Sequence, residues 1–335
     1  MSVRVAVDAM GGDHAPEEIV KGAVLAAREY NIPVQLVGKL EKIRAELGKY
    51  NTKDLDIELV RADEVIGMDE APGSALRKKK NASIVVTVDQ VAKGNSQALV
   101  AAGSTGAAMA ASLFGLGRLP NIDRPAIGVL LPTMDKPVLI LDAGANSACE
   151  PEMLYQFAIM GSSFLSAVLG VENPRVGILN IGGEQGKGNP LVQQTYRILE
   201  EKQETLNFIG NVEGREMFMG YCDVVVCDGF VGNVTLKVTE GVAKMVMELF
   251  RSEVNKSLLA KIGALIAKPA LMNMKKKTDS DEYGGALLLG IKGICVIGHG
   301  SSKAYAIKNA IKLAKESVEG DVNGKISKLY ELSRT

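Results

Sequence analysis

The pattern of hydrophobic and polar positions changes its period within one stretch, residues 222–250. An apolar run at 224–227 is typical of a buried strand, and after a glycine turn at 228–233 the apolar residues recur at helical spacing. They are Val234, Val238, Val242, Met245 and Leu249. The stretch predicts a strand, a turn and a helix. Its turn is either an anion site at a helix N-terminus or an ordinary glycine turn with Asn233 as the N-cap.

The same alternation recurs along the chain. Further strand patterns lie at 3–7, 34–37, 57–60, 97–101, 137–141, 176–181 and 294–297, with helical patterns such as 40–47, 83–93 and 153–169 between them. Alternating strands and helices predict an α/β fold with a doubly wound, mainly parallel sheet and helices on both faces. We expect one large domain over residues 1–335, built as a single body or as two lobes.

Most of these strands run into a polar, glycine-rich turn, at 8–16, 102–106, 142–146, 182–189, 228–233 and 298–302. If all strands are parallel, the turns share one carboxyl edge and face one crevice, where this fold class binds its ligands. A phosphate-sized anion is the expected ligand. The candidate phosphate-binding residues are Asp8, Gly11, Gly12, Gly103, Ser104, Thr105, Gly106, Asp142, Asn146, Gly186, Asp228, Gly229, Gly232, Ser301 and Ser302.

Several familiar chemistries do not fit this chain. The first turn lacks the G-x-G-x-x-G spacing of a dinucleotide site, and the loop around Lys187 misses the P-loop pattern, because Ile181 and Gly188 stand where glycine and Ser/Thr are required. Two histidines, His14 and His299, offer little for a catalytic triad or a multi-histidine metal site. We therefore expect no metal and no cofactor.

Composition narrows the class of partner. Lys+Arg and Asp+Glu both number 39, and a net charge near zero argues against nucleic acid as the main ligand. No apolar run approaches the 18 or so residues of a spanning helix, and the N-terminus enters a strand pattern without a signal-peptide core, so we expect a cytoplasmic protein. The four cysteines, at 149, 222, 227 and 295, are expected to be buried thiols.

Seven motifs together resemble the PlsX family of bacterial phosphate acyltransferases. In one-letter code they are DAMGGDHAP at 8–16, AGSTG at 102–106, DAGAN at 142–146, GNVEG at 210–214, CDGFVGN at 227–233, YGGA at 283–286 and GHGSS at 298–302. The resemblance covers nearly the whole chain in order. The chain departs from the family pattern at Gly183-Glu184-Gln185, where Thr-Glu-Glu is expected, and at Leu287, where proline is expected.

The resemblance implies transfer of a long fatty acyl group from acyl carrier protein to inorganic phosphate, giving acyl phosphate for a membrane glycerol-3-phosphate acyltransferase. It also implies a homodimer, peripheral attachment to the inner face of the cell membrane, and a fold similar to isopropylmalate dehydrogenases and phosphotransacetylases. Two alternatives are a CoA-dependent phosphate acyltransferase and a non-catalytic, membrane-associated scaffold of lipid synthesis.

Four residues are the catalytic candidates. Lys187 and Asn233 are expected to hold the phosphate and the developing oxyanion, since a lysine ammonium suits phosphate and a side-chain amide can donate to a carbonyl oxygen. A solvated lysine and a helix cap are the corresponding structural interpretations. Glu184 is the acidic candidate left in its loop after the departure from Thr-Glu-Glu, and His299 is the further candidate.

Three surface features complete the expectations. Residues 251–280 are predicted to form an amphipathic helical segment that meets an anionic membrane through Leu258, Leu259, Ile262, Leu265 and Ile266, with lysines including 275–277 alongside. The apolar helices at 153–169 and 234–250 are expected to carry the dimer interface. The basic run at 77–80 is either a solvated face or a contact for an acidic macromolecule.

Overall fold

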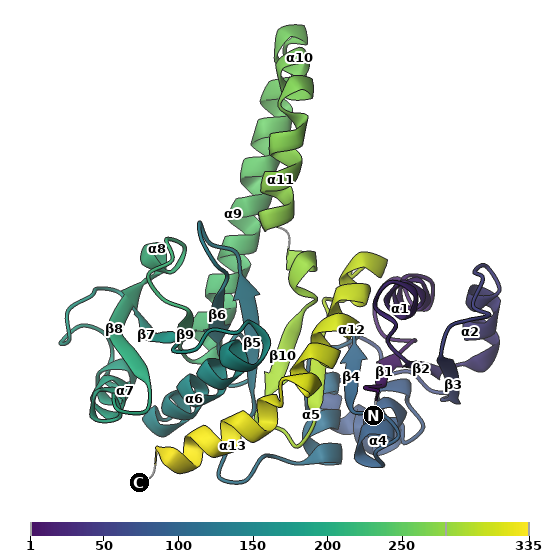
Figure 1. Ribbon diagram of the computed structural model, residues 1–335, viewed down its shortest axis with the longest axis horizontal. Coiled ribbons are helices and arrows are strands. Elements are labelled where there is room, and N and C mark those ends of the chain that lie inside the picture. The colour runs from purple at the N-terminus through teal and green to yellow at the C-terminus, as the bar shows by residue number, and fades with distance from the viewer. Residues whose placement is uncertain (1, 279, 334–335) are drawn as a thin grey trace.

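The computed structural model describes residues 2–278 and 280–333, and the side chains of residues 275–280, including the predicted basic run 275–277, lie outside that description. Figure 1 shows a layered α/β body with a long helical stem standing out from it. The strands are β1 Val5–Asp8, β2 Val34–Gly38, β3 Ile57–Arg61, β4 Ala98–Ala101, β5 Ala126–Leu131, β6 Val138–Leu141, β7 Arg175–Asn180, β8 Asn207–Glu213, β9 Val224–Val226, β10 Ala286–Leu289 and β11 Ile294–Ile297.

Helices cover both faces of the sheet. They are α1 Glu17–Tyr30, α2 Leu40–Leu47, α3 Pro72–Lys78, α4 Ser83–Ala92, α5 Thr105–Leu116, α6 Pro151–Val168, α7 Pro190–Glu201, α8 Gly214–Met217, α9 Gly229–Asn255, α10 Leu258–Ile266, α11 Lys268–Thr278, α12 Ala304–Glu319 and α13 Val322–Leu332, with a 3-10 helix, η1, at Ser280–Tyr283.

The described strands form one sheet in the order β3-β2-β1-β4-β11-β10-β5-β6-β9-β7-β8. Successive side chains of a strand point to opposite faces of the sheet, so alternate residues belong to two different hydrophobic cores. Val7 and Leu139 join the core under α1, α6, α12 and α13, whereas Ala6 and Ile140 join the core under α4 and α5. The prediction of an α/β fold with helices on both faces is confirmed.

The sheet is mixed, and strand direction reverses near its middle. Strand β10 pairs antiparallel with both β11 and β5, and β5 pairs antiparallel with β6, while the remaining pairings are parallel. Strands β6, β7, β8 and β9 therefore run opposite to β1, β2, β3, β4 and β11. The prediction that all glycine turns share one carboxyl edge is wrong. Sheets also twist by roughly 20–25° per strand, so the carboxyl ends of the two blocks are rotated relative to each other.

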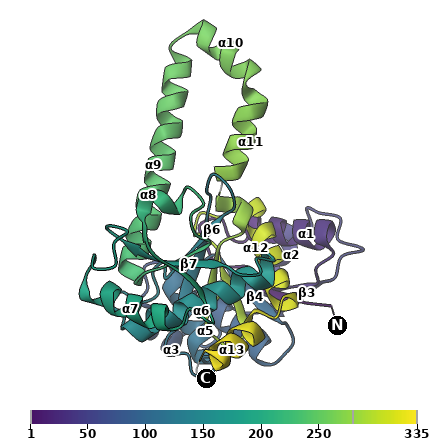
Figure 2. The same cartoon turned by 60° about the vertical axis from the view of Figure 1, so that its left-hand side comes forward.

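The stem consists of α9, α10 and α11. Figure 2 shows α9 and α11 as two separate arms that stand out from the same side of the body, with α10 across their far end. Instead of one helix over 254–266, α9 continues to Asn255 and α10 begins at Leu258, where Ser257 Oγ accepts a hydrogen bond from the Ala260 amide at 3.4 Å. The chain changes direction here, because α9 ends at Asn255 and Ser257 caps the next helix.

Candidate functional site

The turn at 142–146 is built around the carboxylate of Asp142. Its Oδ1 accepts hydrogen bonds from the amides of Ile127, Gly144 and Ala145 at 2.9–3.1 Å, and its Oδ2 accepts from the amide and the side chain of Asn146 at 2.7 and 2.9 Å. Asp142 is fully buried, and burial raises its pKa against the effect of these hydrogen bonds. The expectation that Asp142 contacts phosphate is therefore wrong, because both oxygens are taken up inside the protein.

The N-terminus of α9 lies against this turn with its amides already satisfied. The Gly229 amide donates to the carbonyl oxygen of Asn146 at 2.7 Å, and the Asp228 carboxylate accepts from the amides of Phe230 and Val231 at 3.0 and 2.9 Å. The Gly232 amide donates to the Asp228 carbonyl at 2.9 Å. An anion at this helix end would have no amide left to bind, so the prediction of such a site is corrected, and Asp228 is the N-cap in place of Asn233.

Asn233 lies within α9 and does not cap it. It is exposed on the first turns of α9, and its side chain lies beside Gly144, where an added Cβ would come within 3.5 Å of the Asn233 amide nitrogen. Gly144 has a φ of 132°, which favours glycine. Within the described part of the chain, the Asn233 side-chain amide has no hydrogen-bonding partner. It is therefore free to donate to a bound carbonyl or phosphate oxygen.

The loop that carries Lys187 and Glu184 is held through its backbone. The Asn180 side chain donates to the Lys187 carbonyl at 3.1 Å, Gln193 donates to the carbonyls of Gly186 and Gly188 at 3.0 Å each, and Asn211 donates to the Glu184 carbonyl at 2.8 Å. The side chains of Lys187 and Glu184 are exposed, and neither charged end has an ion-pair partner among the described residues. The fixed backbone therefore presents one free cation and one free carboxylate to solvent.

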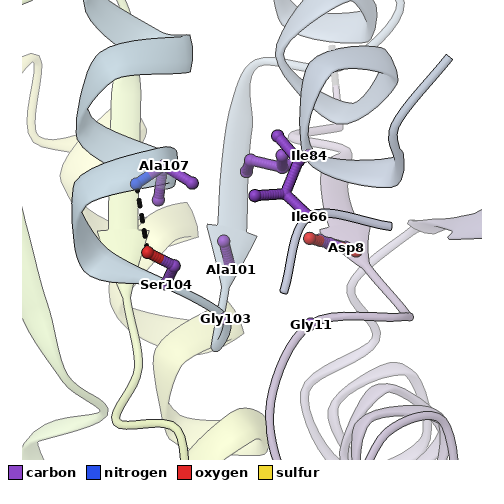
Figure 3. A pocket seen from close by; sticks show the side chains of 9 residues that line it. Asp8, Gly11, Ile66, Ile84, Ala101, Gly103, Ser104 and Ala107 are labelled. Atoms are coloured by element: carbon purple, nitrogen blue, oxygen red, sulfur yellow. Dashed lines mark hydrogen bonds between the residues drawn. The ribbon is translucent and has the colours of Figure 1, made fainter. Parts of the chain in front are cut away.

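Three turns of the other block also come together. Gly11 packs against Gly103, and Gly12, with a φ of 101°, packs against the carbonyls of Ala102 and Gly300. Figure 3 shows Asp8 pointing toward Ile66 and Ile84. The cavity between these residues measures about 10 Å³, which holds at most one water molecule. Asp8 is 4% exposed and accepts from the Met10 amide at 3.0 Å. Asp8 thus supports the turn and does not contact a phosphate, which corrects the prediction.

His299 belongs to this second group of turns. Its Nδ1 lies 2.8 Å from Ser301 Oγ and accepts a hydrogen bond from the Ser301 amide at 3.2 Å. An accepting Nδ1 places the proton of the neutral ring on Nε2. His299 is exposed, so Nε2–H is a donor available to a ligand. Ser302 is buried, and Ser104 Oγ accepts from the Ala107 amide at 3.4 Å as the N-cap of α5.

The predicted residues therefore fall into two groups. Asp142, Asn146, Asp228, Gly229, Gly232 and Asn233 share one cluster of contacts, and Gly11, Gly12, Gly103, Ser301 and Ser302 lie in or beside the other. Sequence reasoning singled out the basic run at 77–80 but did not place residues 63–81 at this site, where Ile66, Met68 and Pro72 contact the second group. Nothing in its hydrophobic pattern signals that contact, because it depends on tertiary packing.

The predicted thiols are free. Cys222, Cys227 and Cys295 are buried and Cys149 is half-buried. Burial raises the pKa of Cys149 to about 12, with the nearby Asp142 carboxylate acting in the same direction. Such a thiol is not ionised at neutral pH, which argues against a cysteine nucleophile.

Comparison with known proteins agrees with this architecture. The family model described as fatty acid synthesis protein matches residues 3–325. A phosphate acyltransferase of Heliobacterium modesticaldum is 54% identical over 320 residues, which cover 95% of this chain and 94% of the relative, and one of Pelotomaculum thermopropionicum is 52% identical over 317 residues, covering 95% and 92%.

Among solved structures, the EutD phosphotransacetylase of Staphylococcus aureus superposes with a TM-score of 0.61 at 14% identity, over 94% of each chain, which supports the predicted fold. The relatives at about half identity decide the family. The chain belongs to the fatty acid synthesis protein family, as a phosphate acyltransferase of the PlsX type.

Proposed function

We propose that this protein transfers a long-chain fatty acyl group from acyl carrier protein to inorganic phosphate, giving acyl phosphate for phospholipid synthesis. A phosphate oxygen attacks the thioester carbonyl carbon and forms a C–O bond. The resulting oxyanion collapses, the C–S bond breaks, and the thiolate leaves on the carrier protein and takes up the proton that the attacking hydrogen phosphate releases. The protein has to orient phosphate, stabilise the oxyanion and assist the thiolate.

One observation carries this proposal: the free ends of Lys187 and Asn233 are exposed on backbones that other hydrogen bonds hold in place. Lys187 is assigned to the phosphate and Asn233 to the oxyanion. We further propose that the two groups of turns meet at the thioester, where His299 Nε2–H, whose tautomer is set by Ser301, donates a hydrogen bond to the departing sulfur. Glu184 lies beside Lys187 in the same loop, and its carboxylate can orient the protonated phosphate.

Replacement of Lys187 by alanine tests the first assignment. The KM for phosphate should rise by about tenfold or more, because an ion pair to phosphate is lost. Gln185→Ala is the control, since Gln185 lies in the same loop and donates to Glu200 at 3.1 Å. An unchanged KM for phosphate in Lys187→Ala would show that this lysine does not bind phosphate.

A second experiment compares acyl-acyl carrier protein with acyl-CoA as the acyl donor. Turnover with one donor and not the other separates the proposed activity from the CoA-dependent alternative, and absence of turnover with either favours a scaffold.

We also propose that the protein meets an anionic membrane surface through α10. No helix in the described part of the chain is long and apolar enough to span a bilayer. The tip of the stem nevertheless exposes Leu258, Leu259, Ile262, Leu265 and Ile266 by 53–83%. Apolar side chains on one short helix with Lys261 and Lys268 beside them suit shallow insertion among anionic headgroups. Acyl phosphate, an amphipathic product, could then pass to a membrane enzyme of glycerol phosphate acylation.

A further inference from the structure

Residues 63–81, named here the cover, lie over the turns that hold His299 and Ser104. Ile66 lines the small cavity at Asp8 and Gly103. The end of the Met68 side chain lies 3.0 Å from the position that a Cβ on Gly300 would take, and Pro72 lies 2.9 Å from the corresponding position on Gly106. The cover therefore touches three turns of this group. Met68 in particular places the cover against Gly300, the residue after the exposed His299.

Three of the four carboxylates of the cover have partners within the protein, and two of those partners are cations. Asp63 accepts from Arg61 at 3.0 Å, Glu64 accepts from the Asn81 amide at 3.0 Å, and Glu70 pairs with Lys79 at 2.5 Å. Lys79 also donates to the Val65 carbonyl at 2.8 Å, so it stays inside the cover. Asp69 is exposed and has no ion-pair partner among the described residues.

The basic run, apart from Lys79, has charged side chains without ion-pair partners in the described part of the chain. Arg77, Lys78 and Lys80 are exposed at the end of α3, and within the described residues none of them pairs with a carboxylate. Arg77 Nε donates only to the Gly73 carbonyl at 3.1 Å. Met68, beside Gly300, is 52% exposed. The cover thus combines three unpaired cations with an exposed apolar side chain that lies beside the His299 turn.

We propose that the cover is the docking surface for an acidic carrier protein, with Arg77, Lys78 and Lys80 meeting its carboxylates and Met68 contacting the acyl-bearing arm on its way to the His299 turn. This inference rests on the proposed use of acyl carrier protein as donor. Three neighbouring cations can attract several carboxylates on the face of an acidic protein at once. This electrostatic attraction raises the rate at which the two proteins meet.

The test is the triple substitution Arg77→Glu, Lys78→Glu and Lys80→Glu. Binding of fluorescently labelled holo acyl carrier protein, followed by anisotropy at low salt, should weaken by about tenfold or more. The KM for acyl carrier protein should rise similarly with little change in kcat. The difference should shrink at 1 M salt, where the screening length is about 3 Å. The milder triple change to glutamine should weaken binding less, and its melting temperature reports folding.

A matched control reverses three exposed lysines elsewhere, Lys42→Glu, Lys53→Glu and Lys328→Glu, which changes the net charge by the same amount. Selective weakening by the cover variant supports the docking surface. Equal weakening by both variants, or unchanged binding in the cover variant, overturns it, as does a wild type that does not bind the carrier protein. A wild type that binds the carrier protein through the cover but makes no acyl phosphate would contradict the proposed function and leave the docking surface standing.

Discussion

The amide of Gly229 donates a hydrogen bond to the carbonyl oxygen of Asn146, with 2.7 Å between nitrogen and oxygen. This bond joins the first residue of α9 to the turn after β6. An added Cβ on Gly232 would come within 1.9 Å of the Asp142 carbonyl oxygen, so the helix and the turn are in direct backbone contact. Asn233 is the next residue, and its position is therefore set by the buried Asp142 turn and not by its own side chain.

Asn233→Ala is expected to lower turnover by about a hundredfold, as is typical when one donor to an oxyanion is lost. The melting temperature should hardly change, because Asp228 caps the helix. Asp228→Ala should behave differently and cost about 1 kcal/mol of folding stability, the usual value of a cap. Kinetics with acyl carrier protein and thermal unfolding of both variants check this. A stability loss without an activity loss in Asn233→Ala would make Asn233 a structural residue.

The buried carboxyl of Asp8 should make the folding stability of the protein depend on pH. Burial raises the pKa of the Asp8 carboxyl above its usual value near 3.8, although hydrogen bonds from Ser83 and from the amides of Met10 and Gly11 oppose this. The protonated form is thus favoured in the folded state, and the stability that it contributes is present below the usual pKa and lost as pH rises through the raised value. Asp8→Asn should therefore gain in melting temperature relative to wild type as pH rises from about 4 to about 7.

Asp13→Asn serves as the control for Asp8, because Asp13 lies in the same turn but is exposed. Its melting temperature should follow that of wild type over this pH range. A constant difference between Asp8→Asn and wild type across the range would show that the Asp8 carboxyl keeps the same protonation state in the folded and unfolded chains.

The sequence predicted the alternating elements well because each buried strand is a short apolar run between glycine turns. Strand β9 and helix α9 lie where the change of period at 224–234 places them. It did not predict β5, β8 or β10. Two of these, β5 and β10, form the antiparallel part of the sheet. A short apolar run such as Ala286–Leu289 does not show whether the strand will pair parallel or antiparallel with its neighbours. Strand direction depends on long-range pairing, so the expectation that all glycine turns share one carboxyl edge failed with it.

The candidate site shows the same limit. Glycine turns and polar side chains were visible, but whether a carboxylate faces a ligand or its own backbone was not. Asp142 and Asn233 both follow strands in similar motifs. One is fully buried with its oxygens occupied and the other is exposed with its amide free. That distinction arises from packing between the turn and α9, which no local pattern encodes.

Self-association is predicted from α9. The earlier expectation included residues 153–169, but α6 is covered by its own chain, with residues such as Phe157 and Phe164 almost fully buried. The apolar positions of α9, by contrast, are about half exposed: Val234 48%, Val238 59%, Val242 49%, Met245 54% and Leu249 57%. A stripe of this length on one helix suits a partner helix, and a second copy of the chain would bury it in a symmetric contact.

Val238→Glu with Val242→Glu should convert a dimer into a monomer, because two charges would be buried in the contact. Sedimentation equilibrium at micromolar concentration measures this. Lys244→Glu is the control on the same helix, since its side chain is exposed and unpaired among the described residues, and it should leave the dimer intact. A monomeric wild type would refute the interface.

Membrane attachment is predicted to depend on the tip of the stem. Leu258→Glu, Leu259→Glu and Ile262→Glu replace side chains that are 77%, 83% and 53% exposed, so the change should not disturb a core. Three carboxylates at an anionic surface oppose both apolar insertion and electrostatic attraction, and vesicles of anionic phospholipid should no longer sediment the protein. Turnover with acyl carrier protein in solution should stay near normal.

The control is a triple variant outside the stem, Phe114→Glu, Met134→Glu and Ile181→Glu, because these residues are 78–84% exposed. If both triple variants lost vesicle binding equally, added negative charge would explain the loss, and if neither did, α10 would not be the membrane contact.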